Sequence, residues 1–156
     1  MDIGSQSNYP ANSLSNFHPH PFKFNYDGIE VYVVSMEGLL QSFKFKHVEI
    51  QKSVCKLAGK AAKFRGKPKK WHRTQTLWWA GKEIDRHSQD YQDLLDAAYS
   101  QMCDQNDGFR RALLASGDGT LTHSIGKRDA HQTILTISEF CGRLIKLRKH
   151  LTKSKK

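Results

Sequence analysis

The sequence predicts a small α+β domain that is mostly helical, with a few short β-strands and a hairpin near the N-terminus. Its 156 residues, 38% of them hydrophobic and 26% charged, suit one globular domain with a core of its own. Asp27-Gly28 separates two runs of β-prone residues, at 22–26 and 29–34, and this arrangement is a strong hairpin signal. Apolar residues then recur at every third and fourth position in several segments, which indicates amphipathic helices.

The first helix is expected after Ser35, which can cap it, and is expected to run to about His47. At about 100° per residue, three polar side chains fall on one stripe of this helix. They are Glu37, Gln41 and Lys44. Leu40 and Phe45 flank the stripe, which is the pattern of a pocket wall. A carboxylate, an amide and an ammonium placed in this way suit a sugar phosphate and acid/base chemistry, although the spacing also suits an exposed face with a weak Glu–Lys pair.

Three later helices follow from caps and periodicity. Ser88 can cap a helix whose apolar positions continue to Met102. A shorter helix is expected over 109–115, and Thr136 with Glu139 forms a capping box that opens the last helix. Short extended segments are expected at 121–125 and 133–135.

The expected organisation is one domain over residues 14–150. Residues 1–13 are polar and are expected to be flexible, and residues 151–156 form a basic tail. Neither a run of about eighteen apolar residues nor the apolar core of a signal peptide occurs, so a cytoplasmic protein without a membrane partner is expected. Three isolated cysteines suit reduced, buried thiols in that compartment. They are Cys55, Cys103 and Cys141.

The charge balance indicates an anionic partner. Lysine and arginine number 25 against 15 acidic residues, so the net charge is +10. The segment 52–73 has nine basic residues and no acidic one, and its second half, with Gly66 and Pro68, is expected to be a loop. Three of its lysines are candidates for binding nucleic-acid phosphates. They are Lys67, Lys69 and Lys70.

Three tryptophans lie near the end of this basic segment or shortly after it, namely Trp71, Trp78 and Trp79. An indole face can stack on a base, but a solvated basic surface with at least one tryptophan in the core explains the same pattern. A metal site is not expected, because His18 and His20 form the only close histidine pair and no zinc motif accompanies them. A glycine-rich phosphate loop is also missing, so a nucleotide-binding site would have to be built from side chains and helix ends. No cofactor is expected.

Taken together, the motifs resemble the NADAR superfamily of YbiA-like proteins, over about residues 14–148. The N-terminal half matches in Ser15-Asn16-Phe17, the hairpin with Gly28, and Glu37-x-x-x-Gln41-x-x-Lys44-Phe45. The C-terminal half is most similar to a branch common in phage genomes. It matches in Leu77-Trp78-Trp79-x-Gly81-Lys82, Arg86-x-Ser88, Tyr91-Gln92, Leu121-Thr122-His123-Ser124-Ile125-Gly126-Lys127, Thr133-Ile134-Leu135-Thr136 and Glu139-Phe140-Cys141.

The resemblance implies a single compact domain, mostly helical, with N-glycosidase activity. Members of the superfamily hydrolyse phosphorylated riboflavin-pathway intermediates or remove ADP-ribose from guanine in nucleic acid. Glu37 corresponds to the principal catalytic glutamate. The positions that correspond to ligand-binding residues are Asn16, Phe17, Gln41, Lys44, Trp79 and Asp129, with Trp71 as the alternative aromatic residue. Two positions depart from the pattern, because Gly38-Leu39 replaces a His-Tyr pair and Asp129 lacks the usual following Trp-Gly.

The expected function is therefore a hydrolase that removes ADP-ribose from modified guanine in DNA or RNA, with a counter-toxin or counter-defence role in a phage-infected or bacterial cytoplasm. The basic surface favours a nucleic-acid substrate. Two alternatives remain open. One is a glycosidase of small phosphorylated ribosyl metabolites, and the other is an ADP-ribose-binding or nucleic-acid-binding module without catalysis.

Overall fold

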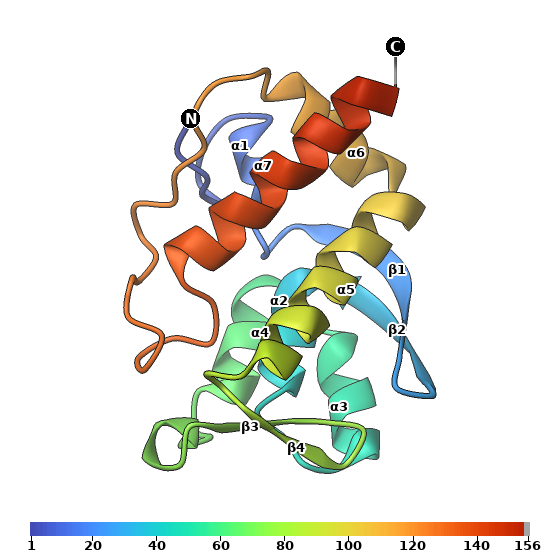
Figure 1. The fold of residues 1–156 in the computed structure, drawn as a ribbon, viewed down its shortest axis with the longest axis vertical. Helices are drawn as coiled ribbons and strands as arrows, with labels where there is room; N and C mark the ends of the chain where they lie inside the picture. The colour runs from blue at the N-terminus through green and yellow to red at the C-terminus, as the bar shows by residue number, and fades with distance from the viewer. Residues whose placement is uncertain (155–156) are drawn as a thin grey trace.

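The computed structural model describes residues 1–154, and within them the chain forms seven α-helices, one short 3-10 helix and two antiparallel hairpins. The helices are α1 (Ala11–Leu14), α2 (Met36–Ser42), α3 (Val48–Cys55), α4 (Gly59–Gly66), η1 (Trp71–Arg73), α5 (Gln89–Gln105), α6 (Asp107–Ala115) and α7 (Ile137–Ser154). The strands are β1 (Pro19–Tyr26), β2 (Ile29–Ser35), β3 (Thr76–Trp79) and β4 (Lys82–Asp85). In Figure 1, α1, α6 and α7 gather at one end, the β3–β4 hairpin lies at the other, and α5 crosses between them. The prediction of a mostly helical α+β fold is confirmed.

The first hairpin forms where Asp27-Gly28 predicts it. Asp27 and Gly28 have φ angles of 55° and 82°, and both central residues of a type I′ turn need positive φ. One face of the hairpin is apolar and buried in the core. The other partner of β1 is α5, because the side-chain amide of Gln101 pairs with the backbone of Asn25 through two hydrogen bonds of 2.8 Å. The helix thereby satisfies backbone groups at an edge that would otherwise lie open.

A second hairpin, β3–β4, was not expected from the sequence. Its turn at Ala80-Gly81 has φ angles of 54° and 79°, as in the first hairpin. The flanking runs are only four residues long, and the resemblance implies a place in the ligand site for Trp79. The side chain of Trp79 instead anchors the hairpin in the core, where its indole nitrogen donates to the carbonyl of Tyr26 at 3.0 Å.

Helix α2 begins at its expected cap and ends earlier than expected. The hydroxyl of Ser35 accepts a hydrogen bond from the Gly38 amide at 3.1 Å. The helix ends at Ser42, where tighter turns replace the helical pattern and the amide of Lys44 donates to the Gln41 carbonyl. Gly38 permits the close approach of α3, because a Cβ atom there would lie 2.8 Å from the Val54 carbonyl oxygen.

Some of the residues in the segment 1–13, which is expected to be flexible, contact distant parts of the chain. Ile3 is only 1% exposed, and its amide donates to the carbonyl of Thr122 at 2.8 Å. The carboxylate of Asp2 accepts hydrogen bonds from the amide and hydroxyl of Ser124. These partners lie about 120 positions away in sequence, so local composition does not reveal them. The extended segment expected at 121–125 is reduced to an isolated parallel bridge between Asp2 and Thr122.

The capping box of α7 forms as expected, and it also completes a buried ion pair. Thr136 accepts from the Glu139 amide at 3.1 Å, while the Glu139 carboxylate accepts from the Thr136 amide at 2.7 Å. The same carboxylate binds the buried guanidinium of Arg86 through two hydrogen bonds of 3.0 and 2.6 Å. The helix continues to Ser154, so part of the expected basic tail is helical. Lys155 and Lys156 lie outside the described residues.

Candidate functional site

Glu37 lies in the first turn of α2, where the hairpin delivers the chain into the helix. Its amide donates to the carbonyl of Asn16 at 3.0 Å, which ties the segment before β1 to the start of α2. One turn later, the side-chain amide of Gln41 donates to Oε1 of Glu37 at 2.9 Å. The Glu37 side chain is half-buried, so it is shielded by its neighbours and still reaches solvent.

Burial raises the pKa of Glu37 above its ordinary value, because a carboxylate loses hydration there. The hydrogen bond from Gln41 and the charges of Lys44, Lys63 and His123 oppose this effect. Burial likewise lowers the pKa of Lys44, against the attraction of Glu37. One carboxyl group thus lies within electrostatic range of three basic side chains, an environment that suits acid/base chemistry on an anionic ligand. We call these five residues, with Asn16, the Glu37 cluster.

Gln41 is held between α2 and α4. It is 7% exposed, and its carbonyl atom Oε1 is buried without a hydrogen-bond partner among the described residues. The end of α4 closes over it, since a Cβ atom at Gly66 would lie 1.9 Å from Oε1. The absence of a side chain at Gly66 therefore gives Gln41 the room to face Glu37.

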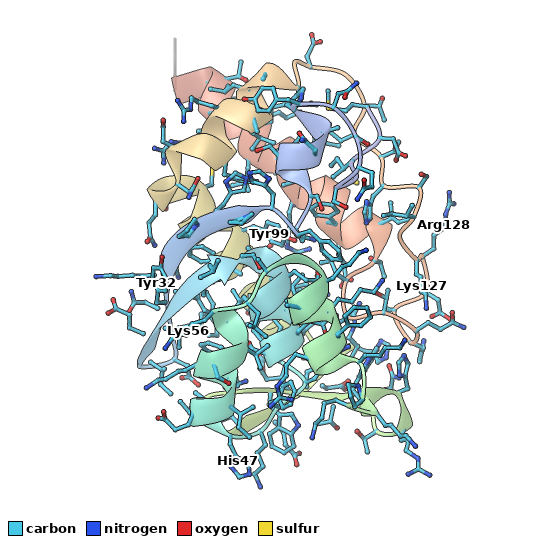
Figure 2. All side chains as sticks on the ribbon, turned by 180° about the vertical axis from the view of Figure 1, so that it is seen from behind. Tyr32, His47, Lys56, Tyr99, Lys127 and Arg128 are labelled. Carbon is cyan, nitrogen blue, oxygen red and sulfur yellow. The ribbon has the colours of Figure 1, made fainter. Side chains whose placement is uncertain are left out.

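Asn16 and Phe17 lie on the same side as Glu37. The hydroxyl of Tyr99 donates to Oδ1 of Asn16 at 2.8 Å, and burial raises the pKa of Tyr99 so that this hydroxyl keeps its proton. The nitrogen Nδ2 of Asn16 remains as a donor without a hydrogen bond in the described part of the chain. Phe17 is half-buried and faces Gly59 at the start of α4. Figure 2 shows Tyr99 in the interior, behind these segments.

The basic segment, residues 52–73, begins in the last turn of α3 and continues through α4 into the loop that follows. Helix α4 packs on α2, and all three candidate lysines are exposed, namely Lys67, Lys69 and Lys70. The guanidinium of Arg65 lies 4.6 Å from the centre of the Phe45 ring, and the Lys69 ammonium lies 5.2 Å from it. Phe64, on the same helix, is 59% exposed. The helix that supplies Lys63 to the Glu37 cluster therefore also carries a positive, partly aromatic surface.

The structure does not bring Trp79 to the Glu37 cluster. Trp79 is 1% exposed, and Phe24 and Phe43 pack edge-on against it at 5.2 and 5.8 Å between ring centres. It borders a different hollow of about 320 Å³, lined by Tyr26, Asp27, Lys82, Glu83, Ile84 and Asp90. Trp71 is also buried, so neither indole has a free face for stacking on a ligand. Trp79 serves the core, and we leave it out of the site.

Asp129 is also placed apart from the Glu37 cluster. It is exposed on the loop before α7, and its carboxylate accepts from the His131 amide at 2.9 Å. This hydrogen bond lowers the pKa of Asp129, with help from the charges of His131 and His87. The described partners of Asp129 thus belong to a histidine-containing corner beside β4, and a contact with the ligand of Glu37 has no support in this placement.

Three members of the site went unrecognised in the sequence: Lys63, Tyr99 and His123. Lys63 was one of nine basic residues in its segment, and nothing in the spacing distinguished it. Tyr99 was assigned to the apolar face of its helix, which hides its hydroxyl. His123 belongs to the matched run Leu121–Lys127, and that run was the available signal.

The cysteines and His20 were the remaining candidates for a nucleophile or a metal ligand, and the structure places them in structural surroundings. The three cysteines are free and buried, as expected, and burial raises the pKa of Cys55 to about 12. A ring nitrogen of His20 lies 2.7 Å from the Ser13 carbonyl oxygen. Among the described residues, no group of three His, Cys, Asp or Glu side chains is arranged to hold a metal ion. No helix in the described range is long and apolar enough to cross a membrane.

Comparison with solved structures supports the fold. The NMR structure of the Escherichia coli protein YbiA superposes with a TM-score of 0.60, over 99% of this chain and 86% of that protein, at 19% identity. The expected likeness to YbiA is therefore confirmed at the level of the fold.

Comparison of sequences identifies the relatives. A 17.1 kDa protein from the Gp30-rIII intergenic region of Enterobacteria phage T4 is 39% identical over 155 residues, which cover 97% of this chain and 98% of that protein. The family model described as bacteriophage protein GP30.3 matches residues 8–149. The chain is thus a phage-type protein with a YbiA-like fold, and it belongs to the bacteriophage protein GP30.3 family.

Proposed function

We propose that this protein is an N-glycosidase that removes ADP-ribose from modified guanine in nucleic acid. The observation that carries the proposal is the half-buried carboxyl group of Glu37, hydrogen-bonded by Gln41 and within electrostatic range of Lys44 and Lys63. A carboxylate next to cations suits a ligand that combines a ribose with phosphates. The YbiA-like fold and the resemblance of the motifs to N-glycosidases favour this reaction class.

The reaction consumes one water molecule. One proton leaves that water, and one proton is delivered to the guanine nitrogen. Water adds to the anomeric carbon of the ribose, and the bond from that carbon to the guanine nitrogen breaks. Its electron pair goes to the nitrogen, which takes up a proton. Glu37 accepts the proton of the water and stabilises the positive charge that develops on the ribosyl carbon. Lys44 and Lys63 bind the pyrophosphate, and Asn16 contributes its free amide donor.

The basic segment supports a polymer as substrate. A small metabolite needs one phosphate site, whereas the exposed lysines that follow α4 add further positive charge to the surface. We place the protein in the cytoplasm of a phage-infected bacterium, where removal of ADP-ribose reverses a toxin or a defence system. Hydrolysis of a small phosphorylated ribosyl metabolite is the second candidate, because the Glu37 cluster alone is sufficient for it.

A panel of three substrates tests the proposal. The protein is incubated with a DNA oligonucleotide carrying ADP-ribosylated guanine, with free ADP-ribosyl guanosine, and with a phosphorylated riboflavin precursor, and products are measured by mass spectrometry. Release of ADP-ribose with restored guanine, faster from the oligonucleotide than from the free nucleoside, is expected. Cleavage of the riboflavin precursor alone selects the second candidate, and cleavage of none of the three refutes the hydrolase assignment for these substrate classes.

A further inference from the structure

Helix α4 has two faces of different character. Its inner face packs on α2, where Ala62 and Gly66 are buried and a Cβ atom at Gly66 would lie 1.9 Å from Oε1 of Gln41. The opposite side of the helix is exposed to solvent, and we call it the outer face of α4. It carries Lys60, Phe64 and Lys67.

Helical geometry places these three side chains together. Lys60 lies one turn before Phe64, and Lys67 lies one turn after it. Lys67 follows the last residue of α4 but keeps helical dihedral angles, with φ of −56° and ψ of −42°, so the geometry of the helix extends to it. At about 100° per residue, the three fall within about 60° of one another, and Phe64 points about 160° away from the buried Ala62.

Phe64 differs from the other aromatic side chains near the basic segment. It is 59% exposed, and among the described residues of α4 it is the only large apolar side chain that is exposed. Phe45 is buried, and the cations of Arg65 and Lys69 cover its ring. Trp71 is buried as well. Phe64 therefore offers an aromatic ring to a ligand from within a segment that has nine basic residues and no acidic one.

An exposed ring with a lysine one turn away on each side suits a single strand of nucleic acid. Ammonium groups bind the phosphates of the backbone, and an aromatic ring stacks on the face of a base. We propose that the outer face of α4 binds such a strand, with an unpaired base stacked on Phe64 and neighbouring phosphates bound by Lys60 and Lys67. This inference rests on the proposed function and deepens it, because it names a surface that holds the substrate outside the Glu37 cluster.

The position of α4 connects this surface to the candidate site. Gly66 on the inner face contacts Gln41, and the Gln41 amide donates to Glu37 at 2.9 Å. A helix with its side chains is about 10 Å across, so the outer face lies about one helix width from Gln41. A strand anchored on Phe64 crosses that distance with a few nucleotides. The surface can therefore hold the flanking part of a strand whose modified guanine reaches Glu37.

A membrane surface is the competing partner for a basic helix with an exposed phenylalanine. A helix that lies on a membrane buries a broad apolar face among the lipid head groups. In α4 the small apolar residue Ala62 faces α2, and Phe64 is the single large apolar group on the exposed side. One ring between two lysines matches a base between two phosphates better than it matches a lipid interface.

The test measures binding of a fluorescein-labelled, unmodified single-stranded DNA oligonucleotide by anisotropy, so that it does not depend on catalysis. Phe64→Ala and Phe64→Leu should weaken binding by about 5- to 150-fold, the range that corresponds to the stacking of one base, and Phe64→Trp should retain it. Tyr32→Ala is the matched control, because Tyr32 is 50% exposed on β2 and projects at the edge of the molecule in Figure 2. It should bind like the wild type, and all four variants should keep the melting temperature of the wild type.

Two further measurements separate stacking from charge. Phe64→Ala removes no charge, so its slope of log K against log salt should equal that of the wild type. Replacement of Lys60 and Lys67 by glutamine should flatten this slope by about 0.7 for each lost contact. With an abasic oligonucleotide of the same length, which keeps the phosphates and lacks the bases, the wild type and Phe64→Ala should bind equally.

The outcomes distinguish this inference from the proposed function. If Phe64→Ala binds the single strand like the wild type, or weakens binding of the abasic oligonucleotide to the same degree, Phe64 does not stack on a base. The N-glycosidase assignment then stands provided that the wild type releases ADP-ribose from the modified oligonucleotide. If the single strand needs Phe64 but no substrate is cleaved, the binding surface stands and the assignment of the reaction fails.

Two results would give the surface to a different partner. One is binding of the wild type to phosphatidylglycerol vesicles that Phe64→Ala abolishes, with unchanged affinity for the oligonucleotide, which would assign the outer face of α4 to a membrane. The other is a concentration-dependent dimer of the wild type that Phe64→Ala dissociates, again with unchanged affinity for the oligonucleotide, which would assign it to a second copy of the chain. Either result would overturn the inference.

Discussion

Gln41 donates a hydrogen bond of 2.9 Å to Glu37 from the next turn of α2, and its other amide atom faces the backbone of Gly66. The orientation of the Glu37 carboxyl group thus depends on a glycine in a different helix. Because α4 also carries Lys63 and leads into the exposed lysines, the contact links the Glu37 carboxyl group to the basic surface.

Gly66→Ala should reduce activity by displacing Gln41. The added Cβ atom would fall 1.9 Å from Oε1 of Gln41, so the amide must move and its hydrogen bond to Glu37 is lost. In other respects alanine favours a helix over glycine by about 1 kcal/mol. Gly142→Ala is the matched control, because that glycine lies in α7 with open space around its Cβ position. We expect steady-state kinetics to show a lower kcat only for Gly66→Ala, and equal kcat values for the two variants would contradict the contact.

Glu37→Gln should alter the pH dependence of folding stability. The pKa of Glu37 is raised in the folded state, so the folded protein binds this proton more tightly than the unfolded chain. The wild type therefore loses stability, relative to the variant, as pH rises from the ordinary glutamate value of about 4.3 through the folded-state pKa. Urea unfolding between pH 4 and pH 8 measures the difference. Glu49→Gln, at an exposed position, is the matched control, and a Glu37→Gln variant that is less stable than the wild type at pH 8 would contradict a raised pKa of Glu37 in the folded state.

Replacement of Lys67, Lys69 and Lys70 by glutamine should weaken nucleic-acid binding and leave cleavage of the free ADP-ribosyl nucleoside intact. Each lost phosphate contact should flatten the slope of log K against log salt by about 0.7 to 0.9. The matched control removes the same charge from exposed positions of α7, with Lys146, Lys149 and Lys153 changed to glutamine. Fluorescence anisotropy at several salt concentrations measures the slopes. Identical slopes for the two triple variants would mean that the basic segment acts only through the overall charge of the protein and makes no phosphate contacts of its own.

Trp79→Ala should lower the free energy of unfolding. Any effect on ligand binding should result from the weakened fold. Truncation of a buried tryptophan costs about 3–5 kcal/mol, and here it also removes the hydrogen bond from the indole to the Tyr26 carbonyl. Trp78 is half-buried under the ammonium of Lys46, so Trp78→Ala should cost much less, about 1 kcal/mol. Chemical unfolding separates the two variants. An unchanged unfolding free energy in Trp79→Ala, with loss of the melting shift caused by ADP-ribose, would return Trp79 to the ligand site.

The parts of the fold that local sequence determines were predictable. Asp27-Gly28, Ser35, Ser88 and Thr136 each act within a few residues, and the hairpin and helix starts lie where these residues indicate. The contact of Glu37 with Gln41 was also visible, because the two residues lie one turn apart on α2, whereas Lys44 lies beyond the end of that helix.

Long-range contacts were not predictable in the same way. Asp2 and Ile3 look like a polar, loose terminus until Ser124 and Thr122 are placed beside them. Trp78 and Trp79 alternate on a strand, and only the register of β3 and β4 shows which indole enters the core. The spacing of residues within one segment does not show which distant residues they contact.

The central claim is that the Glu37 carboxyl group performs the chemistry on an N-ribosyl bond. The most direct test is the rate of ADP-ribose release from an oligonucleotide with ADP-ribosylated guanine, measured for the wild type and Glu37→Gln under single-turnover conditions. The account predicts release by the wild type and a rate lower by about two to four powers of ten in the variant, with its fold and its affinity for the oligonucleotide retained. Near-equal rates for the two proteins would contradict it.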